Sequence, residues 1–379
     1  MRARDASPGA SRRGLARRSA VFAGAVIAAA PAGAAEFGAA WTADFAAVLD
    51  GGLREGERAP GLLELSFDHA WIVRQRELAL HLSAQHVYGG GLSEHWVGDL
   101  QTVSNVDADD GTRVLQAWVD VPLTDALTLK AGRYDFNSEF DALEAGGLFL
   151  NSAQGIGTEI AQTGAVGPSI FPSTAFGVRL QYDAGDHGLW RVVALDVEAD
   201  PDGEYSDSPF TGGTMLALEY EHAAATTTWK GGAWGFSRTR AKLEGQDREP
   251  EYGVYGSVEH RFGERWSVYA RLGLANDDVS RIGRYLGAGL VRHEGLLPGR
   301  DDAIGFALAH ARNGDPYREA LRADGIATDA AETALELTWR VPLGEHLALQ
   351  PDLQYVIDPG TDPSLDDALV FILRLDVAL

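Results

Sequence analysis

The chain has 379 residues, a hydrophobic content of 45%, a formal net charge of −23 and no cysteine. This length suits one large all-β domain as well as two smaller domains. The missing cysteine excludes disulfides, thiolate metal sites and a cysteine nucleophile. The acidic charge argues against nucleic-acid binding, because phosphates would be repelled. The histidines lack zinc-type spacing and no nucleophile-elbow motif occurs, so we expect no enzyme, no metal and no cofactor.

The N-terminus predicts a secretory signal peptide over residues 1–35. Residues 2 to 18 contain six arginines against one aspartate, and SAVFAGAVIAAAPAGAAE follows. A basic segment, an apolar run of about ten residues and the small residues Ala32-Gly33-Ala34 predict export and cleavage after Ala34 or Ala35. The apolar run is short for a membrane span of ~20 residues. Removing the six arginines and one aspartate changes the net charge from −23 to −28.

Residues 36–60 leave two interpretations open, an N-terminal extension or a first strand. From there to residue 379, segments of alternating polarity recur, which is typical of strands with unlike surroundings on their two sides. They include ELALHLSAQHVYG (77–89), ALTLKAGRYD (126–135), FGVRLQYD (176–183), TALELTWRV (333–341), HLALQPDLQYVID (346–358) and ALVFILRLDVAL (368–379). The polar side chains on the inner face are expected to include Arg179, Gln181, Glu336, Arg340, Gln350, Asp352, Gln354 and Arg374.

The strand length and number favour an antiparallel transmembrane β-barrel over a soluble β-sandwich. The segments are about 8 to 12 residues long and are separated by turn clusters, and a membrane strand needs about 9–11 residues. A signal peptide is consistent with export to the outer membrane. The residues of 61–379 accommodate about 16 strands as one barrel domain. Aromatic girdles are expected from Trp71, Trp190, Trp229, Trp266, Trp339, Tyr182, Tyr220 and Tyr285.

Two blocks of the sequence carry a family resemblance. The first begins at Gly98 with G-D-x-Q-x-x-S-N and continues through L-x-x-G-x-x-D at Leu129 to F-x-N-S at Phe149. The second covers G-R-x-D at 299–302 and an E-x-x-x-E…P-x-x-Q-Y-x-x-x-P ending that starts at Glu332. Together, in this order, they resemble the carbohydrate-selective (OprB-type) outer-membrane porin family. Two departures are Arg133, where the family has glutamine, and the C-terminal Leu379, where barrels commonly end in an aromatic residue.

The resemblance implies an outer-membrane barrel of about 16 strands that passes small carbohydrates by passive diffusion. It implies small sugars in transit and outer-membrane lipid as partners, and it leaves a monomer and a trimer both open. A general or ion-selective porin of the same fold is the alternative, and a barrel enzyme or soluble β protein is the third. The residues expected to line the pore or its constriction are Asp99, Asn105, Arg133, Asp135, Arg300 and Asp302.

Overall fold

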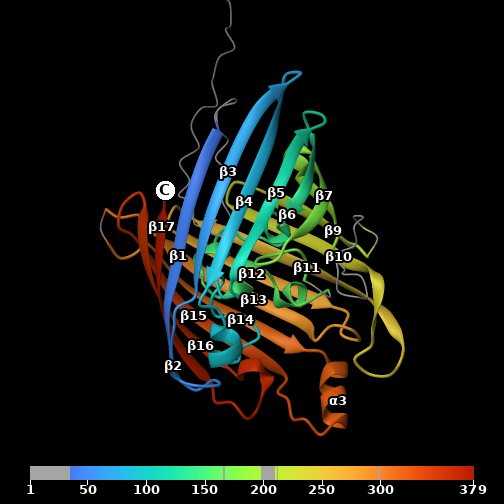
Figure 1. Cartoon of the computed structure of the whole chain (residues 1–379), viewed down its shortest axis with the longest axis vertical. Coiled ribbons are helices and arrows are strands. Elements are labelled where there is room, and N and C mark those ends of the chain that lie inside the picture. The colour runs from blue at the N-terminus through green and yellow to red at the C-terminus, as the bar shows by residue number, and fades with distance from the viewer. Residues whose placement is uncertain (1–34, 165–166, 198–209, 211, 298) are drawn as a thin grey trace, which may run out of the picture.

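The structure is a computed structural model that describes residues 35–164, 167–197, 210, 212–297 and 299–379. The predicted signal peptide lies outside these residues, apart from Ala35. Within the described ranges, sixteen antiparallel strands form a closed barrel. Each strand pairs with its neighbours in the chain, and β1 closes the barrel by pairing with both β17 and β3. The predicted all-β barrel with about 16 strands is therefore confirmed (Figure 1).

The strands are β1 (Ala35–Asp50), β3 (Gly61–Val73), β4 (Arg76–Tyr88), β5 (Gly111–Pro122), β6 (Leu127–Tyr134), β7 (Ala175–Asp183), β8 (Leu189–Leu195), β9 (Met215–Ala223), β10 (Thr227–Ala241), β11 (Arg248–Phe262), β12 (Trp266–Ala275), β13 (Ile282–His293), β14 (Ala303–Asn313), β15 (Ala331–Pro342), β16 (Leu347–Ile357) and β17 (Ala368–Ala378). The short β2 (Gly56–Arg58) pairs only with β1 and is not part of the barrel wall.

The two ends of the barrel differ in their connections. At one end the strands are joined mostly by short turns, such as residues 74–75 between β3 and β4, and both β1 and β17 have their outer ends there. At the other end longer loops carry the α-helices, including α3 in the loop between β14 and β15 (Figure 1). We call these the short-turn end and the long-loop end. No helix in the described ranges is long and apolar enough to cross a membrane.

The helical segments are η1 (Ser93–Val97), η2 (Phe136–Ser138), η3 (Gly146–Leu148), α1 (Ser152–Gly155), α2 (Thr158–Ala161), η4 (Gly185–His187), α3 (Asp315–Ala323) and η5 (Pro359–Thr361).

The alternation predicted from the sequence is observed along the strands. In β16, Leu353 and Tyr355 are exposed on the outer face, whereas Gln350 and Gln354 are buried on the inner face. In β17, Phe371 is exposed on the outer face, whereas Arg374, three residues further along the strand, is buried on the inner face. An apolar outer face and a polar inner face are what a barrel in lipid requires, because the outer side chains meet hydrocarbon.

Aromatic side chains gather on the outer wall near the short-turn end. Trp190, Tyr220 and Trp229 on three adjacent strands form a contiguous row, with ring centroids 4.6 Å and 5.2 Å apart. Tyr182 and Trp266 lie at the same end and are also exposed. This row has the position of an interfacial girdle. Tyr285 does not belong to it: its position on β13 points inward, and its side chain is 2% exposed.

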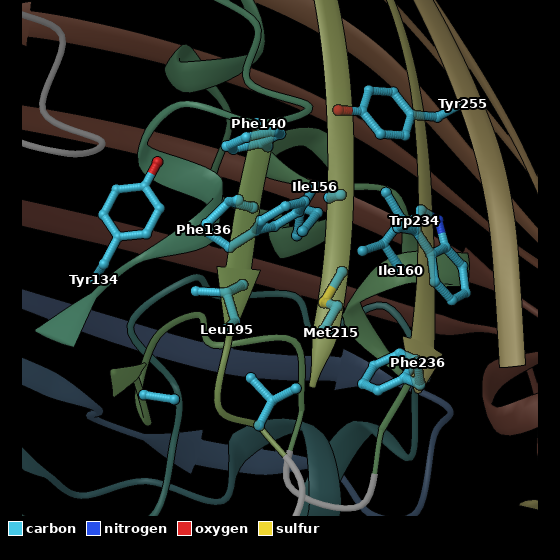
Figure 2. Packing of buried hydrophobic residues seen from close by; sticks show 14 of the residues in the cluster. Tyr134, Phe136, Phe140, Ile156, Ile160, Leu195, Met215, Trp234, Phe236 and Tyr255 are labelled. Atoms are coloured by element: carbon cyan, nitrogen blue, oxygen red, sulfur yellow. The ribbon is translucent and has the colours of Figure 1, made fainter. Parts of the chain in front are cut away.

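A hydrophobic cluster lies inside the barrel, where a water-filled lumen would be expected. It joins Phe136 and Phe140, from the connection between β6 and β7, to Leu195, Met215 and Trp234 on β8, β9 and β10 (Figure 2). The rings of Phe136 and Phe140 stack with their centroids 4.8 Å apart. Burying each such side chain contributes roughly 1.5–3 kcal/mol. The cluster therefore holds part of the β6–β7 connection against the inner wall.

Candidate functional site

The connection between β6 and β7 folds into the barrel and crosses its interior. We call its described residues, 135–164 and 167–174, the inner loop. Its backbone meets polar side chains on β15 and β16: the amides of Leu150 and Asn151 donate to Glu336, at 2.5 Å and 3.2 Å. The side-chain amide of Gln350 donates to the Leu148 carbonyl at 2.7 Å. Buried backbone groups need such partners, so inward polar side chains replace water here.

Arg271 on β12 is a second anchor for the inner loop. Its side chain is 1% exposed, and its Nε lies 3.0 Å from the Asp141 carboxylate. Its guanidinium also donates to the carbonyls of Ala153 and Gly155, at 3.2 Å and 3.0 Å. The Tyr285 hydroxyl donates to the same Ala153 carbonyl at 2.5 Å. One arginine therefore satisfies several carbonyls at the turn around α1.

The wall of β13 and β14 is built from small residues where the inner loop packs against it. A Cβ atom added at Gly305 would lie 2.7 Å from Cζ of Phe149, closer than side chains pack. Ala307 contacts the same cluster as Phe149. The small inward residues of these two strands are Gly287, Gly289, Gly305, Ala307, Ala309 and Ala311. This sequence feature makes room for a loop rather than for a wide lumen.

Glu159 in α2 is a buried acid at the centre of this packing. Its side chain is 1% exposed, and its carboxylate takes the space that a side chain at Gly273 would need. Burial raises the pKa of Glu159 to about 8, and the nearby Asp141 charge adds to this effect. Glu159 therefore carries a proton near neutral pH, which lowers the penalty for burying it.

The connection between β4 and β5, residues 89–110, also enters the barrel and meets the inner loop. The Ser104 hydroxyl donates to Asp44 at 2.6 Å, and Arg374 Nε donates to the same carboxylate at 2.7 Å. The backbone amide of Asn105 donates to the Leu150 carbonyl at 2.7 Å. This second connection thus ties β1 and β17 to the inner loop.

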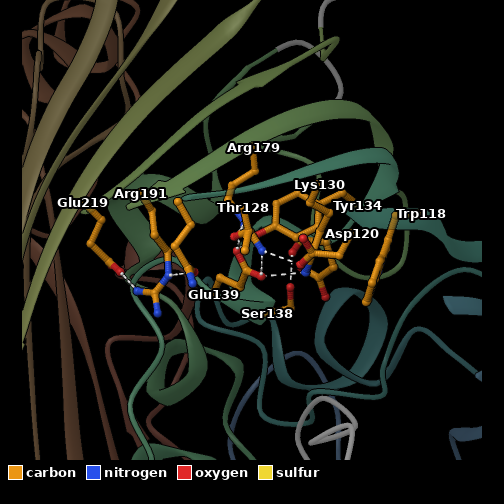
Figure 3. A network of polar contacts seen from close by, with 12 residues as sticks. Trp118, Asp120, Thr128, Lys130, Tyr134, Ser138, Glu139, Arg179, Arg191 and Glu219 are labelled. Atoms are coloured by element: carbon orange, nitrogen blue, oxygen red, sulfur yellow. Dashed lines mark hydrogen bonds and ion pairs between the residues drawn. The ribbon is translucent and has the colours of Figure 1, made fainter. Parts of the chain in front are cut away.

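A network of paired charges lines the inner wall of β5, β6 and β7 (Figure 3). Glu139 of the inner loop lies 2.6 Å from Lys130 Nζ and 2.8 Å from Arg179 Nε. Arg179 also reaches Asp120 at 3.1 Å, and Lys130 Nζ lies 4.0 Å above the ring of Trp118. Burial raises the pKa of Glu139, but the charges of Lys130 and Arg179 outweigh it and lower the pKa to about 2.

The network continues onto the next strands. Arg191 on β8 lies 2.8 Å from both Glu219 and Glu221 on β9, and Lys230 on β10 lies 3.4 Å from Glu221. The Tyr255 hydroxyl donates to Glu219 at 2.7 Å. Ordered charges of both signs beside an aromatic ring can exchange hydrogen bonds with a polar solute. No group of three or more acids and histidines suited to a metal ion occurs among the described residues.

Comparison with known families decides what kind of barrel this is. A sequence model described as carbohydrate-selective porin, OprB family, matches residues 61–379. The chain belongs to the carbohydrate-selective porin family. The predicted resemblance is thereby confirmed, over the same part of the chain. None of the curated protein sequences matches this porin.

Solved structures share the porin's fold. The high-pH structure of Pseudomonas putida OprB superposes with a TM-score of 0.79 at 18% identity, covering 91% of this chain and 94% of that one. Its low-pH structure gives 0.54 at 15% identity, covering 91% and 92%. A triple mutant of the Rhodopseudomonas blastica porin gives 0.56 at 10% identity, covering 91% and 100%. These similarities establish the barrel fold.

The structure places three of the six predicted pore residues in the connections that enter the porin. Asn105 joins the two connections, as described above. The Asp135 side chain accepts from the Asn137 amide at 2.9 Å, and burial raises its pKa to about 7. Asp99 lies beyond η1, and burial raises its pKa to about 6. Their part in a constriction stays a prediction.

The other three are not brought together with this group. Arg300 and Asp302 lie at the short-turn end, between β13 and β14. Arg300 donates to the Pro342 carbonyl at 3.3 Å, and Asp302 accepts from the Leu296 amide and the Trp339 indole, each at 2.8 Å. Arg133 pairs with Phe176, a residue exposed on the outer wall. We therefore do not carry Arg133 forward as a constriction residue.

The sequence reasoning left out several residues of the porin's interior. Lys130, Glu139 and Arg271 were not among the predicted pore residues. For Lys130 a signal existed, because it alternates with the outward leucines of β6. For the contacts of Glu139 with Arg179 and of Arg271 with Asp141, no local pattern could have served as a signal. The two residues of each pair are far apart in the sequence, and Glu139 and Asp141 lie in a loop rather than in a strand.

Proposed function

We propose that this porin sits in the outer membrane with its long loops facing outward and passes small sugars by passive diffusion along the wall of β5, β6 and β7. The observation that supports this is the charge network of Lys130, Glu139 and Arg179 beside Trp118. Outer-membrane barrels commonly have short periplasmic turns and longer external loops. No turnover chemistry is part of the proposal.

The network suits a solute that carries many hydroxyls. Each hydroxyl both donates and accepts a hydrogen bond, so paired carboxylates and cations can replace its water partners. The Trp118 indole is buried, with Lys130 Nζ 4.0 Å above its ring and the His81 ring stacked on it at 5.2 Å, so it is not a sugar contact. The partly exposed carboxylates of Asp120, Glu139 and Glu221 are the groups of the network that a sugar can reach. The charges are already paired with each other, so a sugar does not have to neutralise them and is released again. A channel needs such a balance between entry and release.

The experiment is single-channel recording from the purified, refolded protein in a planar bilayer, titrated with glucose. We expect the open-channel current to fall saturably with glucose. Asp120→Ala should raise the half-blocking concentration roughly two- to tenfold, because a lost hydrogen bond costs about 0.5–1.5 kcal/mol. Asp125→Ala, the same change at an exposed residue of the turn between β5 and β6, is the matched control and should leave the block unchanged.

Two results would contradict the proposal. A steady current that ignores sugars would leave a general porin of the same fold. A block that Asp120→Ala and Asp125→Ala change equally would remove the inner wall of β5 from the sugar path. Heat-modifiable gel migration checks that each variant has folded into a barrel.

A further inference from the structure

Arg133 is a cation on the outer wall of the barrel. Along β6 the inward positions are Lys130, Gly132 and Tyr134, and Arg133 alternates with them. Across the sheet it pairs with Phe176 on β7 and Ala117 on β5. Among the described residues, Arg133 has no hydrogen-bond or ion-pair partner. An unpaired arginine among lipid-facing side chains therefore needs an explanation.

A hollow of about 520 Å³ lies beside this arginine. It is lined by Arg113, Val114, Ala117, Arg133 and Ser173. Three of the five, Val114, Ala117 and Arg133, have outward positions on their strands, so the hollow lies on the outer wall. The register between β4 and β5 shifts at this place, between Ser83 and Ala84, and such a bulge bends the strand. The small side chain of Ala117 leaves further space between the strands.

The hollow lies at the depth of the membrane interface rather than at the middle of the bilayer. Arg133 is the last but one residue of β6, and Arg113 is the third residue of β5, so both lie at the long-loop end. An arginine on the lipid face destabilises a barrel by about 2–4 kcal/mol at the midplane but by about 0–1 kcal/mol near the interface. The position is therefore compatible with insertion, and the side chain can reach the headgroup layer.

The charge of the hollow is positive on a chain whose net charge is −23. None of the five residues that line it is acidic. Arg113 pairs with Gln85 across the sheet and donates to the backbone carbonyl of Asp109 at 2.9 Å. Arg113, Arg133 and Ser173 are the polar residues that line the space, while Val114 and Phe176 offer apolar surface next to it. An anion from outside the chain would complete this arrangement.

We propose that the hollow binds the phosphate of a phosphorylated lipid in the leaflet at the long-loop end. Guanidinium groups form charge-assisted, often bidentate hydrogen bonds with phosphate. Ser173, an exposed residue where the inner loop returns to the wall at the start of β7, supplies a further donor. The acyl chains lie along the exposed apolar wall below. This inference concerns the outer surface of the barrel. It does not depend on which solute passes through the interior.

The test is native mass spectrometry of the detergent-purified, refolded porin titrated with diphosphorylated lipid A. Arg133→Gln should weaken binding about fivefold, which is the factor expected for one basic group beside anionic lipid. The double variant R113Q/R133Q should weaken it further, about twentyfold. Arg133→Lys should weaken binding less than Arg133→Gln, because the charge remains although the bidentate geometry is lost.

Arg284→Gln is the matched control. Arg284 is also outward and near the long-loop end of its strand, but it lies beside Asp277 and Asp315 and has only a very small hollow. This variant should bind lipid A like the unchanged porin. Equal binding by R133Q and the unchanged porin would overturn the proposal. So would equal binding of fully dephosphorylated lipid A, or complete displacement by millimolar inorganic phosphate, which would indicate a site for a free anion.

Discussion

Two long connections at the long-loop end of the barrel differ in burial: one is packed inside the barrel and the other is not. The inner loop enters the barrel, and many of its side chains, such as Phe140 and Leu150, are almost completely buried. The connection between β14 and β15, residues 314–330, carries α3, and none of the residues of that helix is buried. α3 contacts the rest of the barrel through few side chains, such as Tyr317, whose ring lies 4.9 Å from the Arg281 guanidinium.

The difference lies in what the wall offers each connection. The wall facing the inner loop supplies acceptors and donors for its backbone, through Glu336, Gln350 and Arg271, and small residues where it packs. α3 keeps its own backbone hydrogen bonds and needs no such partners. A loop with little regular structure can be buried only where the surrounding side chains satisfy its backbone. The barrel wall and the inner loop are therefore complementary.

The largest expected effect is from Arg271→Ala. Removing the guanidinium leaves the buried Asp141 carboxylate without its cation, and it removes one of the donors to each of the carbonyls of Ala153 and Gly155. Breaking a buried ion pair in this way costs about 3–5 kcal/mol. We expect the inner loop to detach, so that single-channel conductance rises and hydrogen exchange of the amides in α1 becomes faster.

Arg318→Ala in α3 is the control for this comparison. Arg318 pairs with Asp315 at 3.4 Å in a partly exposed position, and such pairs contribute about 0.3–0.5 kcal/mol. Conductance should remain that of the unchanged porin. An equal rise in both variants would show that the two connections do not differ in the way described.

The second prediction concerns pH and Glu159. Its pKa of about 8 in the packed loop exceeds the ordinary value of 4.5, because burial and Asp141 disfavour its charge. Between these two values the detached loop releases a proton that the packed loop retains. Docking of the inner loop should therefore weaken as pH rises through this window, by up to about 1.4 kcal/mol per pH unit, and should be strongest below it.

Hydrogen exchange of the Ile160 and Ala161 amides, followed from pH 5 to pH 9 after correction for intrinsic rates, measures this effect. Glu159→Gln should remove most of the pH dependence of loop opening. Glu319→Gln, on the exposed α3, should leave it unchanged. A pH profile identical in the Glu159→Gln variant and the unchanged porin would rule out this role for Glu159.

The smallest effect is expected from Gly305→Ala. The new methyl group would lie 2.7 Å from the ring of Phe149, and overpacking costs about 1 kcal/mol or slightly more. Gly231→Ala is the same substitution at a strand glycine, on the outer face of β10, where the new methyl group meets no atom within 4 Å. A shift of the heat-modifiability midpoint in the first variant and not in the second would support the complementarity of wall and loop. Equal midpoints would contradict it.

The alternation of the sequence was sufficient to predict the wall. Leu353 against Gln354 and Phe371 against Arg374 follow from a period of two residues, because neighbouring side chains of a strand point to opposite faces. The same period places Arg133 with Leu129 and Ala131 on the outer face. The family resemblance suggested an inner position for Arg133, and the local alternation was the better guide.

The interior of the barrel could not be predicted in this way. Arg271 contacts Asp141, which is 130 residues away in the sequence, and Leu150 contacts Glu336, which is 186 residues away. No short-range pattern encodes such pairs. The glycine and alanine positions of β13 and β14 are visible in the sequence, but they do not state which segment packs there. The girdle position predicted for Tyr285 was wrong for the same reason, since its partner is the Ala153 carbonyl of the inner loop.

The pairing of β1 with β17 has a consequence for how the chain is ordered. Ala39 and Leu379 exchange backbone hydrogen bonds, at 2.9 Å and 3.4 Å, so the first and last described strands meet like any two neighbours. The wall is a ring, and its starting point in the sequence is arbitrary. Joining Ala35 to Leu379 by a short linker and opening the chain at the exposed turn of residues 224–226 should therefore yield the same barrel with a different first strand.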